Sequence, residues 1–301
     1  MLGEATLTRA VPIRQDSPMD VILWGNSSRP GTGIKPRRES SRPLLPQHAR
    51  HCPVLEAGSG LGYLVYPPLE PTESFLIEYQ GEGRYQFMFF MADAGGKWSP
   101  FFKVIISMPV GAVGLLKEET TFMVPNPPID DEGAKRIMRT FLVPEDIHTP
   151  PGAVTLRGAY NFKTPPGWDS VYVPVLNQVD RPLAPMMVVR VETDWYAHET
   201  EFRYVLQPGQ VIPGAHNMPL GQVFFVPREE GVLRDATADE VAAIKKDREE
   251  FVKHKSETKL TTRYGLQYSP HYVRQSRVVR SALAGSQGES GESDREGDGD
   301  R

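Results

Sequence analysis

The sequence predicts a mainly β protein: an antiparallel β-sandwich or jelly-roll-like domain, followed by a C-terminal helix and a disordered tail. Apolar runs of strand length alternate with turn-forming residues through the middle of the chain. The 28 prolines and 27 glycines among 301 residues favour many strands and turns over long helices. The hydrophobic and charged fractions, 39% and 24%, are those of a soluble globular protein with a real core.

Composition divides the chain into four segments. Residues 1–50 form an arm rich in Arg, Pro and Ser, which we expect to lie solvated across the surface. Residues 51–232 form the β-rich domain, 233–283 a helical extension and 284–301 a disordered acidic tail. The net charge of −4 is carried by the tail, so the remainder is neutral and gives no strong signal for binding nucleic acid.

Strand signals begin at Gly62. Five runs, rich in β-branched and aromatic residues, are separated by turn formers: GYLVY (62–66), SFLIEY (74–79), RYQFMFFM (84–91), PFFKVIISM (100–108) and TTFMV (120–124). Several runs are continuously apolar, which predicts that both faces of their strands are covered. Residues 130–141 carry apolar side chains at helical spacing and predict a short helix.

Turn chemistry organises the second half of the β-rich domain. Thr-Pro-Pro-Gly occurs at residues 149–152 and 164–167, and Pro-Gly suits the central positions of a type II turn. A strand is expected from Pro185 to Trp195, with its apolar residues at odd positions. The apolar residues from Phe202 onward are even-numbered, so a bulge or tight turn is expected between Trp195 and Phe202.

The helical extension opens with a capping box at Thr237 and Glu240 and continues to about Lys255. Its narrow apolar stripe consists of Val241, Ile244, Phe251 and Val252. The stripe is suited to packing on the β-rich domain, and the same pattern would fit a partner. From Ser281 the composition predicts disorder.

The single cysteine, Cys52, excludes an intrachain disulfide and a thiolate zinc site. A lone cysteine is compatible with a reducing cytoplasm, where we expect this protein. No basic stretch followed by an apolar segment begins the chain, so no secretory signal is expected. The longest uncharged apolar run, residues 104–116, is too short to span a bilayer.

The glycine-rich stretch VLEAGSGLG, residues 54–62, resembles the cofactor loop of S-adenosylmethionine-dependent methyltransferases. Such a loop requires a helix directly after it, within a βαβ crossover. Pro67, Pro68 and Pro71 prevent a useful helix before Phe75. A methyltransferase is therefore the least favoured interpretation.

Residues 192–201 hold the longest polar cluster of the chain. Glu192 and Asp194 share a strand face, and with His198 they are candidate ligands for a divalent metal. Asp194 and His198 are also a candidate acid–base pair. The alternative is a solvated polar face in which Asp194 has a turn or salt-bridge role. Nearby aromatic residues such as Trp195 either line a ligand pocket or pack on the sheet.

Three motifs together resemble an uncharacterised bacterial family, a domain of unknown function: FKTPPGW (162–168), ETDW (192–195) and Pro208-Gly209. The resemblance covers roughly residues 52–229 and implies no established reaction. If the family has a common site, the resemblance implies Trp168, Glu192, Asp194 and Trp195 as ligand-binding residues. His198 lies outside the shared pattern.

The sequence thus favours a non-catalytic module whose surface around Trp168 and residues 192–198 engages a protein partner or a small molecule. A metal-assisted enzyme using Glu192, Asp194 and His198 is the alternative. Serine-nucleophile and phosphate-loop patterns are absent, and the sequence names no cofactor.

Overall fold

The computed structural model describes residues 19–38, 52–108, 116–143, 150–178, 184–229, 231, 233–261, 265 and 267–288. The chain forms two compact units, of which the larger is Asp20–Glu230. The described residues from Gly231 onward belong to the smaller unit. The predicted class, mainly antiparallel β with a C-terminal helix, is confirmed, because all strand pairs among the described residues are antiparallel.

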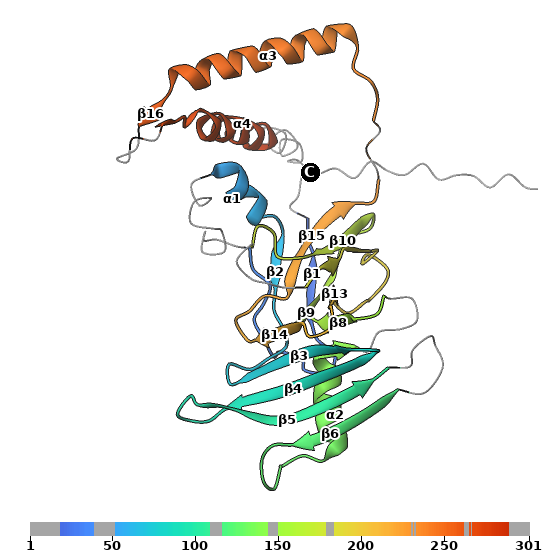
Figure 1. Cartoon of the computed structure of the whole chain (residues 1–301). Coiled ribbons are helices and arrows are strands. Elements are labelled where there is room, and N and C mark those ends of the chain that lie inside the picture. Colours follow the sequence, from blue (N-terminus) through green and yellow to red (C-terminus); the bar gives the residue numbers. More distant parts are fainter. Residues whose placement is uncertain are drawn as a thin grey trace, which may run out of the picture. The chain divides into compact units, whose positions relative to one another are not determined.

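Three sheets make up most of the larger unit (Figure 1). The five-stranded sheet has the order β14 (Val211–Ala215), β3 (Glu73–Gly81), β4 (Arg84–Ala92), β5 (Trp98–Ser107), β6 (Lys117–Phe122). A four-stranded sheet has the order β12 (Val189–Val191), β10 (Trp168–Val173), β15 (Gly221–Pro227), β2 (Tyr63–Val65). The other has the order β11 (Met186–Met187), β13 (Glu201–Val205), β8 (Ala153–Arg157), β7 (Leu142–Val143).

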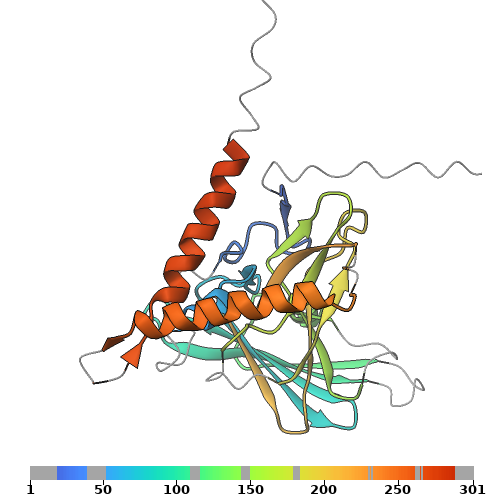
Figure 2. The ribbon, with the colours of Figure 1, turned by 90° about the horizontal axis from the view of Figure 1, so that it is seen from above.

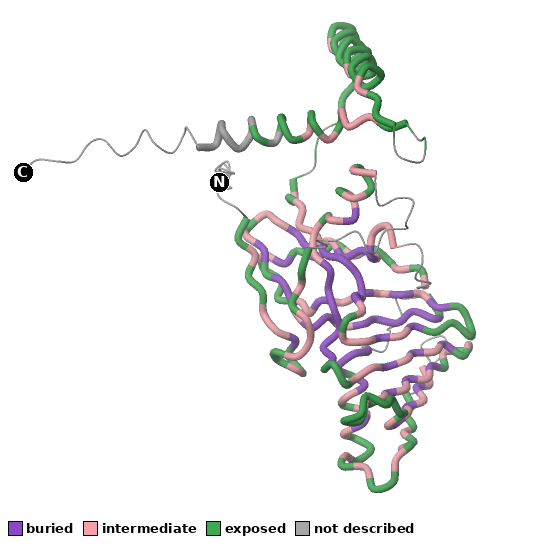
Figure 3. Tube along the Cα trace, turned by 90° about the vertical axis from the view of Figure 1, so that its left-hand side faces the viewer, coloured by how far each residue is buried: buried purple, intermediate pink, exposed green. Residues whose placement is uncertain are grey.

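Burial alternates along the long strands β3, β4 and β5. Phe75, Phe87 and Phe102 are buried on one face of the five-stranded sheet, whereas Leu76 and Met88 on the other face are only partly buried. Figure 3 shows this alternation of buried and partly buried residues along the strands. The expectation that both faces are covered was therefore wrong for β3, β4 and β5, whereas consecutive residues 64–66 of the first run are all buried.

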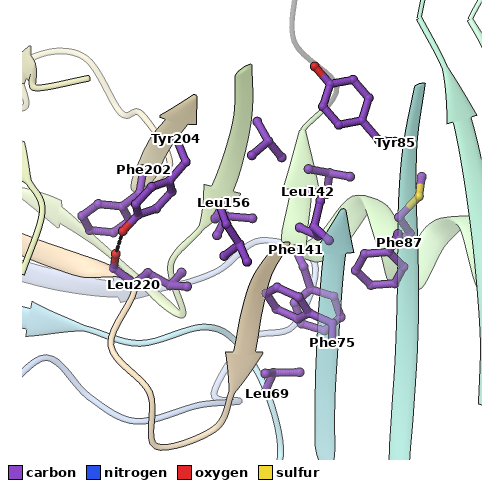
Figure 4. Close-up of a cluster of buried hydrophobic side chains, with 14 of the residues drawn as sticks. Leu69, Phe75, Tyr85, Phe87, Phe141, Leu142, Leu156, Phe202, Tyr204 and Leu220 are labelled. Atoms are coloured by element: carbon purple, nitrogen blue, oxygen red, sulfur yellow. Dashed lines mark hydrogen bonds between the residues drawn. The ribbon is translucent and has the colours of Figure 1, made fainter. Parts of the chain in front are cut away.

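Helix α2 (Asp131–Phe141) covers the buried face of this sheet, and it is the short helix predicted from the sequence. It begins at Asp130, whose side chain accepts a hydrogen bond from the backbone N–H of Gly133 at 2.8 Å. Phe141 at its end packs on Phe75, with ring centroids 5.3 Å apart (Figure 4).

The same core continues into the two four-stranded sheets. Leu156 of β8 and Phe202 and Tyr204 of β13 are fully buried within it (Figure 4). The Tyr204 hydroxyl donates a hydrogen bond to the backbone carbonyl of Leu220. One continuous hydrophobic cluster therefore holds the three sheets together.

The glycine-rich stretch does not lead into a helix. Helix α1 (Pro53–Ser59) includes Gly58, ends before Gly60 and was not predicted, and β2 follows the last glycine, Gly62. Gly62 has φ +71°, and a Cβ there would lie 2.1 Å from the backbone oxygen of Val223. This glycine thus allows close packing against β15, and no βαβ crossover forms at this stretch.

The described part of the N-terminal arm is integrated into the larger unit, contrary to the expected boundary at residue 51. Strand β1 (Ile22–Gly25) pairs with β9 (Tyr160–Lys163). Asn26 is fully buried and its side-chain amide donates to the Gly158 carbonyl at 3.1 Å. Arg29 forms a bidentate ion pair with Glu73. Residues 1–18 and 39–50 of the expected arm lie outside the described residues.

Both predicted Pro-Gly turns are present. Gly152 and Gly167 have φ values of +86° and +80°. The backbone N–H of Ala153 donates to the Pro150 carbonyl at 3.0 Å, and that of Trp168 to the Pro165 carbonyl at 3.2 Å.

The expected strand from Pro185 to Trp195 does not form as one strand. Residues 186–187 and 189–191 belong to different sheets, so the chain passes from one sheet to the next at Val188. After Val191 the chain leaves the sheet, and Thr193, Asp194 and Trp195 form a turn. Side-chain alternation along a strand therefore does not apply to them.

The smaller unit contains α3 (Ala238–Glu257) and α4 (His271–Gly288), joined through the hairpin of β16 (Leu260–Thr261) and β17 (Gln267–Tyr268). The predicted capping box at Thr237 and Glu240 is confirmed. Helix α4 continues past Ser281, where disorder was expected to begin. Of the expected tail, residues 289–301 lie outside the described residues.

Candidate functional site

The segment Glu192–His198, named here the Trp195 loop, follows β12 and leads to β13. Its second residue, Thr193, is buried, and its hydroxyl oxygen lies 2.9 Å from that of Thr164 and 2.8 Å from that of Ser170. Thr164 opens the Pro-Gly turn before β10, and its hydroxyl also donates to the Trp168 carbonyl at 2.6 Å. Buried hydroxyl contacts thus join the TPPGW and ETDW motifs in space.

Asp194 anchors the loop a second time through charge. One of its carboxylate oxygens lies 2.6 Å from the Arg228 guanidinium, and the other accepts a hydrogen bond from the Gly167 N–H at 2.9 Å. Arg228 also makes two hydrogen bonds to Asp169, at 3.0 and 2.7 Å. Arg190 pairs with the other oxygen of Asp169 at 2.7 Å. This ionic cluster holds the Trp195 loop against the ends of β10 and β15.

Burial and pairing decide the charge states of this cluster. The Asp169 side chain is only 2% exposed, and a carboxylate so buried requires paired cations. The hydrogen bond from Arg228 lowers the pKa of Asp194 below its usual value, and the Gly167 N–H acts in the same direction. Hydrogen bonds to Asp194 and Asp169 raise the pKa of Arg228. Asp194 is therefore ionised at neutral pH and serves as an anchor.

Two aromatic side chains on this loop face solvent. Trp195 is 70% exposed and Tyr196 48% exposed. Their ring centroids are 5.7 Å apart, and the Tyr196 ring stacks on His198 at 5.1 Å with an interplanar angle of 11°. The Trp195 indole N–H donates to the Glu192 carboxylate. The exposed rings therefore form a continuous aromatic row with one carboxylate at its edge.

A second ionic group holds the far end of the loop. Glu199 accepts a hydrogen bond from the Ser27 backbone N–H at 3.2 Å and pairs with Arg157 at 3.1 Å. His198 Nε2 lies 3.5 Å from Glu201. Burial acts to raise the pKa of Glu201, but the hydrogen bond from His198 and the charges of His198 and Arg157 outweigh it and lower that pKa.

The structure brings together only part of the predicted site. Glu192, Asp194 and Trp195 lie on one loop, with Glu192 and Asp194 3.7 and 2.6 Å from the same guanidinium nitrogen of Arg228. Trp168 contacts this group through its backbone, because its carbonyl accepts the hydrogen bond from the Thr164 hydroxyl.

The alternative metal set is not assembled. His198 pairs with Glu201, while Asp194 is engaged by Arg228. Among the residues that the structure describes, no group of three or more His, Cys, Asp or Glu side chains is arranged to hold a metal ion. The polar cluster thus has the salt-bridge role that the sequence left open for Asp194.

Sequence reasoning missed Arg228, which pairs with Asp194, and Asp169, which pairs with Arg228 in turn. The available signal was that Asp169 directly follows the TPPGW motif. Nothing local marks Arg228, which is 59 positions away from Asp169.

No protein-family model, no curated protein and no solved structure matches this chain. The resemblance to an uncharacterised bacterial family stays a prediction. Within the described part of the chain, no helix has the length and apolar character that crossing a bilayer requires.

Proposed function

We propose that this protein is a non-catalytic binding module that engages a ligand or partner through the Trp195 loop. The observation that carries the proposal is a tryptophan 70% exposed on a loop anchored by buried contacts at Thr193 and Asp194. Tryptophan and tyrosine are the residues most enriched among those that dominate binding energy. Because the loop is already ordered, binding would cost little conformational entropy.

The side chains of the Trp195 loop indicate which chemical groups a ligand should carry. The faces of Trp195 and Tyr196 favour a flat apolar or ring-shaped surface. Glu192, whose side chain is 48% exposed, and Arg228, whose side chain is 35% exposed, offer a hydrogen-bond acceptor and donors beside the rings. A ligand with one flat face and a polar edge, such as a sugar or a nucleoside, satisfies both groups, and so does an aromatic side chain of a protein partner.

Fluorine NMR of protein containing 5-fluorotryptophan tests the proposal. The chain has four tryptophans, so four resonances are expected, each assigned by a Trp→Phe variant. Nucleosides, pyranose oligosaccharides and short aromatic peptides are titrated as probes. We expect at least one probe to shift the Trp195 resonance in a saturable manner. Trp195→Ala should weaken the binding of that probe at least about tenfold, as truncation of a central aromatic anchor does.

Trp98 provides the matched control, since it is also exposed, at 47%, but lies at the start of β5. Its resonance should stay unchanged, and Trp98→Ala should bind as the wild type does. The proposal fails if the probes that bind do so equally well to Trp195→Ala and Tyr196→Ala, or if none of the probe classes binds.

The cytoplasm remains our proposed compartment. The support for it is compositional, namely a single cysteine that leaves no intrachain disulfide to form.

A further inference from the structure

Helix α3 presents an apolar stripe that its own unit leaves uncovered. All twenty of its residues are described, and none is buried. Ile244 is 61% and Val252 55% exposed, and Val241 on the same face is exposed as well. In proteins, packing of an apolar face supplies most of the stability of a helix, so an uncovered stripe on α3 leaves that contribution unmade.

Helix α4 covers only the C-terminal part of α3. The His271 ring lies 4.9 Å from that of Phe251 and 5.7 Å from that of His254, measured between centroids. The two helices diverge from the β16–β17 hairpin (Figure 2), so α4 moves away from Val241 and Ile244. The exposed stripe borders a shallow depression of about 480 Å³, lined by Lys245, Arg248, Glu249, Val252, Lys253 and Ser256.

Most of the charges along α3 meet opposite charges when the helix direction is reversed. Acidic residues come first, at Asp239 and Glu240, followed by Lys245 and Lys246, then Glu249 and Glu250, then Lys253 and Lys255. Reversal about a point between Asp247 and Arg248 brings residues of opposite charge to the same level at Glu240 and Lys255, at Lys245–Lys246 and Glu249–Glu250, and at Asp247 and Arg248.

We propose that α3 pairs antiparallel with α3 of a second copy of this chain. With the two-fold axis near Asp247 and Arg248, Lys245 of one copy lies beside Glu249 of the other, and Arg248 beside Asp247. The same register places Glu240 beside Lys255 of the second copy. Three opposite-charge contacts in one register, each made twice, flank the apolar residues.

A parallel pair is disfavoured by the same charges, because identical residues then lie at the same level and Lys245 approaches its own copy. A different protein partner would not require α3 to complement its own reversed sequence. The self-complementary pattern therefore selects a second copy as the occupant.

Charge exchange in the full-length chain tests this pairing by sedimentation equilibrium over a range of concentrations. The wild type should show a concentration-dependent monomer–dimer equilibrium. Lys245→Glu and Glu249→Lys each place like charges together at two symmetric positions, and each should raise the dissociation constant about tenfold or more. The double variant restores opposite charges and should return the dissociation constant to near the wild-type value.

Lys246 and Glu250 form the matched control. They have the same i, i+4 spacing as Lys245 and Glu249, but lie roughly 100° further round the helix, away from the stripe. Lys246→Glu changes the net charge by the same amount as Lys245→Glu and also removes one i, i+4 ion pair within the helix. It should nevertheless leave the dissociation constant of the dimer unchanged. Circular dichroism verifies that helix content is equal in all variants.

Cysteine cross-linking in a Cys52→Ser background reports the orientation independently. Arg248→Cys lies near the proposed axis and should form a disulfide-linked dimer readily. Ile244→Cys should not, because two copies of residue 244 are about seven residues, or roughly 10 Å, apart along antiparallel helices. The proposal is overturned if the wild type stays monomeric, if the double charge exchange does not restore association, or if Ile244→Cys cross-links as fast as Arg248→Cys.

Discussion

Asp169 is the residue on which the geometry of the candidate site depends most. Its carboxylate is buried at the start of β10 and makes hydrogen bonds to Arg190 and to Arg228. Arg228 in turn holds Asp194 and with it the Trp195 loop. Asp169 is the buried member of this cluster, whereas the Arg190 and Arg228 side chains are 42% and 35% exposed, so loss of the carboxylate removes charged hydrogen bonds from both arginines.

We expect Asp169→Asn to lower the free energy of unfolding by about 1–3 kcal/mol, since two partly exposed arginines lose their charged hydrogen-bond acceptor. Urea unfolding at pH 7 measures the change. Asp93→Asn is the control, because Asp93 accepts backbone N–H groups of Gly95 and Lys97 that an asparagine oxygen can also accept. That variant should differ from the wild type by no more than about 0.5 kcal/mol. Equal effects at both positions would contradict the central role of Asp169.

The pH dependence of stability should report Asp194. Its pKa is lowered from 3.8 in the folded state, chiefly by the hydrogen bond from Arg228. A lowered pKa contributes stability that is fully present well above pH 3.8 and is lost as the pH falls through the folded-state value. Urea unfolding between pH 7 and pH 3 should therefore show the difference between wild type and Asp194→Asn shrinking below pH 4. A difference that grows on acidification would contradict the assignment.

At the scale of elements, two Pro-Gly turns that look alike in sequence have different surroundings. Gly152 and Gly209 both have positive φ, +86° and +82°. A Cβ at Gly152 would lie 2.1 Å from the Leu206 carbonyl oxygen, whereas a Cβ at Gly209 would meet nothing within 4 Å. The first turn therefore has no room for a side chain beside the backbone at the end of β13, whereas the space beside the Gly209 Cα is open.

Substitution by alanine should separate the two turns. Gly209→Ala carries only the cost of a left-handed backbone, about 1–2 kcal/mol. Gly152→Ala carries that cost plus a clash with backbone, so its loss of unfolding free energy should be at least about twice as large. Thermal and urea unfolding of the two variants measure the difference. Equal losses would show that the Leu206 backbone relaxes freely.

The elements were predictable to the extent that local chemistry defines them. The short helix at residues 130–141, the Thr237 capping box and the Pro-Gly turns require only a few neighbouring residues, and all are present. Strand boundaries after Pro185 were not predictable, because Val188 marks a change of sheet that depends on which strands are available to pair. The integration of β1 depends likewise on β9, which is more than a hundred residues away.

At the scale of the whole molecule, the two units differ in what stabilises them. Every buried hydrophobic residue among those the structure describes lies in Asp20–Glu230. The smaller unit has exposed apolar stripes and no buried residue on α3. The larger unit should therefore fold independently.

A chain of residues 20–230 should keep the cooperative unfolding transition of the full-length protein, with a midpoint within a few degrees. A chain of residues 39–230, which lacks β1, Asn26 and Arg29, is the comparison. It loses the buried hydrogen bonds of Asn26 and the ion pair of Arg29 with Glu73. We therefore expect its free energy of unfolding to be lower by about 2 kcal/mol or more, with a correspondingly lower denaturant midpoint. Equal midpoints for the two chains would show that the arm is dispensable.

The amino-acid sequence by itself determined the antiparallel β class, the starts of α2 and α3, the Pro-Gly turns, and the absence of a nucleotide-binding crossover. These follow from interactions over a few residues: proline geometry, capping side chains and apolar period. Only the tertiary structure decided that Arg228 joins Asp169 and Asp194, that Thr193 meets Thr164 and Ser170, and that Trp195 faces solvent. Those outcomes depend on buried contacts between residues 23 to 59 positions apart, which sheet pairing brings together and which no local pattern encodes.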